Sequence, residues 1–325
     1  MIITKTPLRI SFAGGGTDLP SYYIKNQYGC VVSSTINKYL YVIVKKREKV
    51  FDESIRLNYS ETELVKNINQ IKNPIIKACL EYMNIKEDLY ISTFSDLPSQ
   101  SGLGSSSSFC VGLLKALYAY KKVKISSKKL SQVASDIEIN HLNRPIGKQD
   151  HYAATYGGLN YFIFKKNKVS VKKINIGKKN FLNFEKSVSL INTGIFRSAS
   201  KVLKKQSRKS KKNEHIYHEI KNLVPIFLSA LKKGDIKKCG KIIKQNWELK
   251  KKLDAKVYLN KFRTIENKLD KIGVYGYKLL GAGSGGYYCI LSTQKQKKKL
   301  RKIFKKKFLD VKFDSLGARE VKIFI

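Results

Sequence analysis

Apolar and polar positions along the 325-residue chain follow two periodicities, which predict strands and helices in mixed order. Residues 8–14 (LRISFAG) alternate and residues 39–46 (YLYVIVKK) are β-branched and aromatic, as is typical of strands. Residues 74–83 and 106–120 have helical spacing, and 126–142 is a third helix that begins with serines suited to capping. We also expect strands at 89–98, 157–165, 186–194 and on both sides of a glycine turn in 278–292, helices in 212–272 and 294–308, and a terminal strand, EVKIFI.

Because these strands and helices do not alternate strictly, the order of elements favours an α+β fold over a parallel βαβ fold. The length fits one large domain or two ordinary ones, and no internal repeat is present. We expect two domains, residues 1–185 and 186–325, although no linker-like composition marks the boundary.

The composition is that of a globular protein. Hydrophobic residues make up 42% of the chain and aromatic residues 11%, which is enough for a sizeable core. No apolar run of 18 residues occurs and the first residues lack the order of a signal peptide, so we expect a cytoplasmic protein without membrane insertion. The five cysteines are scattered and form no CxxC pair, which predicts reduced packing thiols and argues against a cysteine-bound metal.

The net charge of +41 is large enough to attract any polyanion, so a nucleic-acid-binding protein is one alternative function, and binding to an anionic membrane surface is another. Only nine of the 65 basic residues are arginine, however, and arginine is the usual reader of guanine edges. We therefore interpret the charge as a lysine-rich solvated surface, and we expect no specific nucleic-acid partner. Small anionic ligands would be favoured by this charge.

Residues 97–120 (LPSQSGLGSSSSFCVGLLKALYAY) place glycines and serines directly before an apolar helix. Amides at a helix start have no internal partner and carry part of the positive helix dipole, so they bind anions. Glycines let the backbone approach a phosphate, and a serine hydroxyl can be a magnesium ligand. The Walker and dinucleotide-binding patterns are absent, and a linker or a crowded helix cap is the alternative. We predict a phosphate-binding loop made of Pro98, Ser101, Gly102, Leu103, Gly104, Ser105, Ser106, Ser107 and Ser108.

A second glycine cluster, GGGTDLP at 14–20, follows the strand that contains Arg9. Thr17 and Asp18 could bind a hydroxyl-rich ligand from this tight turn. The alternative is an ordinary turn in which Asp18 caps the next segment. A third cluster, GAGSGG at 281–286, is either a hairpin turn or a place of close backbone approach to a ligand or another loop, since four glycines exceed what a turn needs.

Two carboxylates form the next candidate constellation. Glu138 adjoins the apolar side of the helix 126–142, where a carboxylate needs a cation. Asp150 follows twelve residues later, in a segment that we expect to be a loop. Such a pair near a phosphate loop suits magnesium binding and proton abstraction, and the alternative is an ordinary ion pair with lysine.

In this order, the strings TPLRISFAGGGTDLPSYY, LPSQSGLGSSSS and LLGAGSGGYY resemble the three motifs of the GHMP kinase superfamily, across essentially the whole chain. The resemblance implies a phosphotransferase with an alcohol group as acceptor. It also implies an N-terminal domain like domain 2 of ribosomal protein S5, a ferredoxin-like C-terminal domain, and ATP bound between them.

Within the superfamily, galactokinases carry GEHTD where this chain has AGGGTD. RISFAGGGTDLPSYY, GKQDHYAATYGGLNYF and NTGIFRSAS are similar to the D-glycero-D-manno-heptose 7-phosphate kinases. This resemblance implies ATP- and Mg²⁺-dependent phosphorylation of the anomeric C1 hydroxyl to the 1,7-bisphosphate, for nucleotide-activated heptose in capsule or lipopolysaccharide biosynthesis. Fucokinase-type enzymes share related strings, so a kinase for an unphosphorylated sugar is the alternative.

The resemblance also implies residue roles. Asp150 would be the base for the sugar hydroxyl, and Arg9 would support Asp150 and the transferring phosphoryl group. Ser106 and Glu138 would hold Mg²⁺, with the neighbouring serines 105 and 107 as alternatives to Ser106. The sugar hydroxyls would be bound by Gly16, Thr17 and Asp18.

A phosphorylated sugar needs a second anion site. Arg197, Ser198 and Lys201 follow a predicted strand, and arginine suits bidentate binding of phosphate. An exposed loop in a basic protein is the alternative. The adenine contacts are not identified by the sequence, and a homodimer is left open.

Overall fold

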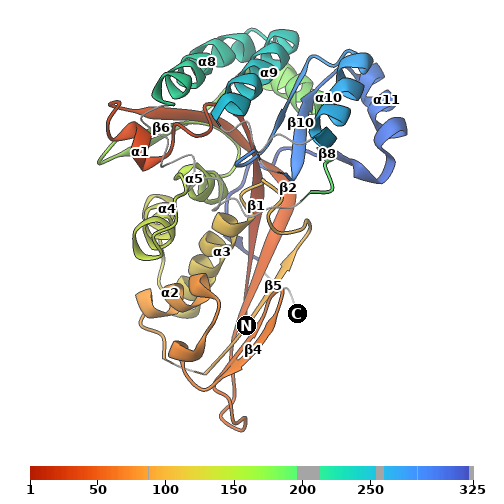
Figure 1. Ribbon diagram of the computed structural model, residues 1–325. Coiled ribbons are helices and arrows are strands. Elements are labelled where there is room, and N and C mark those ends of the chain that lie inside the picture. The colour runs from red at the N-terminus through yellow and green to blue at the C-terminus, as the bar shows by residue number, and fades with distance from the viewer. Residues whose placement is uncertain (87, 196–212, 254–259, 284, 322–325) are drawn as a thin grey trace.

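The computed structural model in Figure 1 describes residues 1–86, 88–195, 213–253, 260–283 and 285–321. The fold contains two β-sheets, in which most neighbouring strands are antiparallel. The larger sheet has the order β12-β1-β2-β5-β3-β4, with β6 paired to β2 and β7 to β6. Its strands are β1 (Ile2–Ala13), β2 (Gly29–Lys46), β3 (Ile55–Asn58), β4 (Thr62–Val65), β5 (Leu89–Ser95), β6 (Leu159–Phe164), β7 (Val169–Lys173) and β12 (Arg319–Glu320). The smaller sheet has the order β11-β8-β10-β9 and contains β8 (Val188–Asn192), β9 (Gly276–Leu279), β10 (Tyr287–Leu291) and β11 (Phe308–Asp310).

Helices cover both sheets (Figure 1). The helices that precede β8 along the chain are α1 (Pro20–Tyr23), α2 (Pro74–Tyr82), α3 (Ser105–Tyr120), α4 (Ser127–Asp136), α5 (Gln149–Tyr156) and α6 (Gly177–Ser187). Those that follow β8 are α8 (Glu214–Lys232), α9 (Ile236–Leu253), α10 (Asn260–Ile272) and α11 (Gln294–Phe304). Short 3-10 turns lie at Ile68–Gln70 and Lys305–Lys307, and a π-helical turn at Ile137–His141.

Strand β2 connects the two ends of the larger sheet, because it changes partners along its length. Near its start it pairs with β6, and beyond Leu40 it pairs with β5. On its other side it pairs with β1, and this register shifts between Pro7 and Arg9. Arg9 therefore lies directly after this register shift in β1. It is opposite the part of β2 where pairing with β6 ends and pairing with β5 has not yet begun.

Helix α3 lies against β1 and β2, and more than half of its residues are buried. Cys110, Leu113 and Leu117 have no exposed surface and pack in one hydrophobic cluster with residues of α2 and α4. Helices α8 and α9 pack on the upper end of β1 instead (Figure 1), where Phe12 stacks on Phe227 with ring centroids 5.9 Å apart. Burial of these apolar side chains drives the association of the helices with the sheet. The start of α3 and the end of α9 are therefore both positioned by packing on β1.

The structure confirms the α+β class and the other predicted strands and helices, with three corrections. Of the predicted terminal strand EVKIFI, residues 322–325 lie outside the described part of the chain, and β12 ends at Glu320. Asp150 lies in the first turn of α5 rather than in a loop. The predicted helix 126–142 is α4 followed by a π-helical turn, which contains Glu138. The predicted helix 294–308 ends at Phe304, because the chain turns and continues as β11. The domain boundary at residue 185 stays a prediction.

The cysteines are placed as the sequence predicts. All five cysteines are buried and none forms a disulfide, as expected for packing thiols. Among the described residues, no helix combines the length and the apolar character that crossing a membrane requires.

Candidate active site

A cavity of about 740 Å³ opens between the phosphate loop, the loop after β1, the segment 138–150 and the end of α9. Eleven of the residues predicted from sequence line it: Arg9, Gly16, Asp18, Pro98, Gly102, Gly104, Ser105, Ser106, Ser107, Glu138 and Asp150. Segments that are far apart in sequence therefore contribute to one site.

The predicted phosphate loop ends at the start of α3. Gly104 is the N-cap residue, has left-handed backbone angles (φ 79°, ψ 21°), and no side chain caps the helix. The amides of the first turn therefore have no partner from a capping side chain, and the serines that carry them line the cavity. This arrangement suits an anion at the helix start, and it does not agree with the alternative of a serine-capped helix.

The remaining residues of the loop attach it to β1. The Leu103 carbonyl accepts a hydrogen bond from the Arg9 amide at 3.0 Å, and the Ser108 hydroxyl donates to the Pro7 carbonyl at 3.2 Å. Ser101, Leu103 and Ser108 are completely buried. Leu103 and Ser108 hold the loop against β1, and none of the three lines the cavity.

The glycines of GAGSGG allow a second loop to lie against the phosphate loop. A Cβ on Gly286 would lie 2.0 Å from the Ser101 carbonyl oxygen, and one on Gly281 would lie 2.6 Å from the Gly102 Cα. No side chain fits at such distances, so these positions require glycine. Of the two interpretations of this cluster, close approach to another loop accounts for its extra glycines.

Arg9 connects Asp150 to the phosphate loop. Its Nε and Nη2 donate to the two Asp150 carboxylate oxygens, each at 2.7 Å, and its Nη1 donates to the Gly102 carbonyl at 2.6 Å. The Arg9 side chain is 4% exposed and that of Asp150 is 22% exposed. A bidentate pair of this kind fixes the carboxylate in one orientation.

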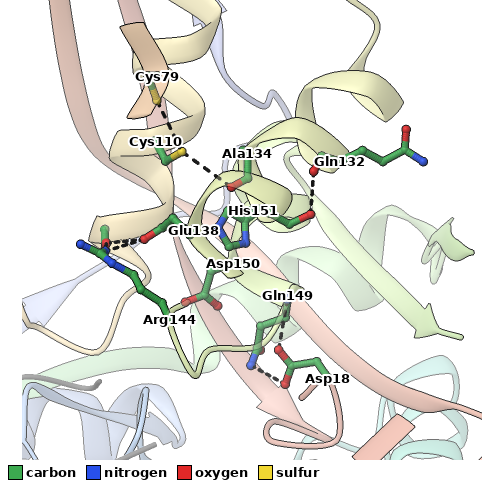
Figure 2. A network of polar contacts seen from close by, with 12 residues as sticks. Asp18, Cys79, Cys110, Gln132, Ala134, Glu138, Arg144, Gln149, Asp150 and His151 are labelled. Carbon is green, nitrogen blue, oxygen red and sulfur yellow. Dashed lines mark hydrogen bonds and ion pairs between the residues drawn. The ribbon is translucent and has the colours of Figure 1, made fainter. Parts of the chain in front are cut away.

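Asp18 is held by Gln149, the first residue of α5 and the neighbour of Asp150, as Figure 2 shows. The Gln149 amide and side-chain Nε2 donate to it at 3.1 and 3.0 Å, and the Gly16 amide donates at 3.0 Å. Burial raises the pKa of Asp18, and the charge of Asp150 raises it further, whereas these amide hydrogen bonds oppose the rise. Asp18 does not cap the short helix α1, which has no side-chain cap.

Thr17, expected to contact the sugar, is completely buried and does not line the cavity. Its hydroxyl lies 2.8 and 2.9 Å from the Gly14 and Cys30 carbonyl oxygens, to either of which it can donate its one hydrogen, and it accepts from the Cys30 amide at 2.9 Å. In this structure its hydroxyl holds the turn that presents Gly16 and Asp18.

Glu138 lies at the centre of a buried polar network (Figure 2). Its Oε1 accepts from the Ser106 hydroxyl at 2.9 Å and from Arg144 Nη1 at 2.7 Å, and its Oε2 lies 2.8 Å from His151 Nε2. Burial alone would raise the pKa of Glu138. The hydrogen bond and charge of His151, the charge of Arg144 and the Ser106 hydroxyl outweigh it and lower that pKa to about 2.

Ser106 and Glu138 fit a Mg²⁺ site. Their oxygens lie 2.9 Å apart and both residues line the cavity, so they could supply hard oxygen ligands beside phosphate oxygens and water, as Mg²⁺ prefers. Among the described residues, no group of three or more histidines, cysteines or carboxylates could hold a metal without such help. The Arg144 guanidinium contacts the same two oxygens, at 2.7 and 3.0 Å.

Three charged residues of the site were not identified from the sequence. Arg144 and His151 contact Glu138, and Lys250 lines the cavity from α9. Arg144 is one of only nine arginines and lies between the two predicted carboxylates, which is the only sequence signal that pointed to it. Arg197, Ser198 and Lys201, the predicted second anion site, lie outside the described residues.

Comparisons with known proteins identify the family of the chain. A family model described as GHMP kinases N terminal domain matches residues 64–158, and one described as GHMP kinases C terminal matches residues 227–310. The D-glycero-alpha-D-manno-heptose 7-phosphate kinase of Campylobacter jejuni is 31% identical, with 99% of each chain covered. The galactokinase of Pyrococcus furiosus is 27% identical, over 88% of this chain and 87% of the relative.

A similar solved structure is the crystal structure of a D-glycero-D-manno-heptose 1-phosphate kinase from Bacteroides thetaiotaomicron. It has a TM-score of 0.81, 25% identity and complete coverage of both chains. A crystal structure of mevalonate kinase, at 23% identity and a TM-score of 0.71, shares the fold. Both family models match in order and one relative exceeds 30% identity over nearly the whole length. The chain therefore belongs to the GHMP kinase family and is an ATP-dependent phosphotransferase.

Proposed function

We propose that this kinase transfers the γ-phosphoryl group of ATP to the anomeric C1 hydroxyl of D-glycero-D-manno-heptose 7-phosphate. The product would be the 1,7-bisphosphate, an intermediate toward nucleotide-activated heptose for capsule or lipopolysaccharide. The observation that carries the proposal is the Arg9–Asp150 pair, held at the amide end of α3 and beside Asp18. The relative from Campylobacter jejuni, which is named for this heptose, supports the choice of substrate.

In the proposed reaction, Asp150 accepts the proton of the anomeric hydroxyl while the oxygen of that hydroxyl forms a bond to the γ-phosphorus of ATP. The bond from that phosphorus to the β–γ bridging oxygen breaks, and ADP leaves with the bonding electrons. An anomeric hydroxyl is more acidic than most alcohols, so a carboxylate is a sufficient base. Arg9 fixes the Asp150 carboxylate with two hydrogen bonds and adds positive charge beside the transferring group.

The nucleotide phosphates would be bound by residues 102–108, where α3 begins. Ser106 and Glu138 would hold Mg²⁺, which would neutralise negative charge on the nucleotide phosphates. Arg144 would then turn from Glu138 toward the phosphates or solvent, because its guanidinium and a metal cannot both lie on the same oxygens.

The adenine would lie at the other end of the cavity, near β5. Tyr59, Phe94 and Leu97 line that end together with Asn73, which could supply a polar contact. An apolar wall with few polar groups is typical of a nucleobase site. The sequence did not reveal this part of the cavity, because its residues come from separate strands and loops.

The sugar would lie on the Asp18 side of Asp150, with Gly16 beside it and Thr17 supporting the turn. We keep Arg197, Ser198 and Lys201 as the proposed site for the 7-phosphate. A cytoplasmic location without membrane insertion also stays part of the proposal, and a homodimer remains open.

The experiment is a panel of sugars tested for ATP-dependent ADP release. We expect the fastest turnover with the heptose 7-phosphate, much slower turnover with the unphosphorylated heptose, fucose and galactose, and product carrying a phosphate on C1. Inorganic phosphate and sulfate should compete with the sugar, since the second anion site accepts them. Faster turnover of an unphosphorylated sugar, without competition by these anions, would replace the proposal with a fucokinase-like activity.

A further inference from the structure

Lys250 approaches the site from the C-terminal half of the chain. It lies in the last turn of α9, which packs on the end of β1, and its side chain is a partly buried part of the cavity wall. Its ammonium donates a hydrogen bond to the Gly281 carbonyl. Because Gly281 packs directly on Gly102, this contact places the ammonium beside the phosphate loop.

Charged groups face Lys250 from four elements. They are Arg9 on β1, Asp18 in the loop after β1, Asp150 on α5 and Lys278 on β9. Burial and the charge of Arg9 lower the pKa of Lys250 to about 8, although Asp18 and Asp150 oppose this shift. The Lys250 side chain is therefore still largely charged at neutral pH, and the two acids Asp18 and Asp150 help to keep it so.

Other lysines nearby have different partners. Lys278 is completely enclosed and donates to the Phe12 carbonyl at 3.1 Å, so it braces β1 against β9. Lys251 pairs with Glu248 at 2.8 Å and with Glu266 at 3.3 Å on the other side of α9. Lys252 is exposed. Of these four lysines, Lys250 is the one that lines the cavity.

We interpret the hydrogen bond to Gly281 as the resting position of the Lys250 ammonium before the substrates bind. A single carbonyl satisfies one of the three ammonium donors, and the flexible lysine stem lets the head group move by a few ångströms. The groups around it are those that the proposed reaction uses: Asp150 as base, Arg9 beside it and the phosphate loop next to Gly281. Ser106 and Glu138 lie on α3 and the π-helical turn, so the metal and Lys250 would approach from different walls.

We propose that Lys250 is a catalytic residue that leaves Gly281 when ATP is bound and contacts the γ-phosphoryl group as it is transferred. This inference rests on the proposed function. During transfer the bond between the acceptor oxygen and phosphorus forms, the bond to the ADP oxygen breaks, and the acceptor proton passes to Asp150. Lys250 neither gives nor takes a proton. It neutralises negative charge on the oxygens of the transferring group, on the side away from the metal ligands.

The test compares Lys250→Met and Lys250→Arg with the matched control Lys252→Met, which removes an exposed lysine two residues along the same helix. For Lys250→Met we expect kcat to fall by about 10²–10³, as is typical when one charge-stabilising donor is lost. The Kd of a non-hydrolysable ATP analogue and the melting temperature should change little. Lys250→Arg should recover part of the rate, and Lys252→Met should match the wild type.

A pH profile separates a charge role from a packing role. The wild-type kcat/KM should decline above about pH 8 as Lys250 loses its proton. Lys250→Arg should lack that decline, because arginine stays charged. Equal rate losses for Met and Arg with a lowered melting temperature would show a structural role and overturn the inference. A raised KM for the sugar with an unchanged kcat would overturn it as well.

The wild-type sugar panel tests the proposed function separately. If no sugar in the panel is phosphorylated, the variants can still be compared by their slow rate of ATP hydrolysis, in which water accepts the phosphoryl group. A fall of that rate in Lys250→Met supports the inference whichever sugar is the acceptor. An unchanged rate contradicts it.

Discussion

Replacement of Asp150 by asparagine is expected to remove turnover while ATP binding stays nearly intact. The amide has the shape of the carboxylate but cannot accept the acceptor proton, and loss of a general base typically costs about 10²–10⁴ in rate. Asparagine can still accept one hydrogen bond from Arg9, which otherwise bonds both carboxylate oxygens at 2.7 Å. The measurements are kcat by ADP release and the Kd of a non-hydrolysable ATP analogue.

The control for this variant is Asp52→Asn, which changes an exposed aspartate that does not line the cavity and should leave both values unchanged. The melting temperature of each variant shows whether the unpaired Arg9 guanidinium disturbs the fold. A folded Asp150→Asn enzyme with full activity would eliminate Asp150 as the base. A large loss of ATP affinity at unchanged stability would assign Asp150 to nucleotide binding instead.

The second large effect is expected from Glu138→Gln. Glutamine keeps the size of the side chain but removes the negative charge that a Mg²⁺ ligand supplies, so the Mg²⁺ concentration for half-maximal activity should rise roughly tenfold or more. The same change should reduce the stabilisation of the nucleotide-bound protein by Mg²⁺, measured as a shift of melting temperature. Neither measurement depends on knowing the sugar.

Glu61→Gln is the control for the metal titration, because Glu61 is exposed and does not line the cavity. Glu138 also pairs with Arg144 and His151, so the apparent stability without metal has to be measured for both variants. A Mg²⁺ titration of Glu138→Gln that overlays the wild-type curve would remove Glu138 from the metal site. The network would then serve only to position Ser106 and His151.

Features that depend on local sequence were predicted well. The helix after the glycine- and serine-rich loop was predicted from its apolar spacing, and the structure has that helix as α3, while phosphate binding by the loop stays a prediction. The surplus glycines of GAGSGG predicted close backbone approach, which Gly281 and Gly286 make against the phosphate loop. In both cases the physical signal lies within about twenty consecutive residues.

The helical position of Asp150 was missed for a local reason. Helix α5 has only eight residues and follows a segment with Pro145 and Gly147, which reads as a loop. Nothing in its apolar pattern distinguishes one face, because buried residues such as His151 and Tyr152 follow each other directly. Packing against α3 and α4 decides its conformation, and a single sequence does not contain that information.

Residues that act through long-range contacts were missed for another reason. Lys250 lies 100 positions after Asp150 and reaches the cavity only because α8 and α9 pack on β1. In a chain whose basic residues are mostly lysine, no local property marks this one. Arg144 is similar, since its contact with Glu138 depends on the chain turning back, with the Arg144 amide bonded to the Glu138 carbonyl at 3.0 Å.

The central claim is that the amide end of α3 holds the terminal phosphates of ATP between the metal ligands and the base. Its most direct test is a crystal structure with Mg²⁺ and a non-hydrolysable ATP analogue. We expect phosphate oxygens within about 3 Å of amides in residues 104–107, the metal on Ser106 and Glu138, and Asp150 facing the γ-phosphate. An analogue bound outside this cavity, or phosphates on the side of the loop away from Asp150, would contradict the account.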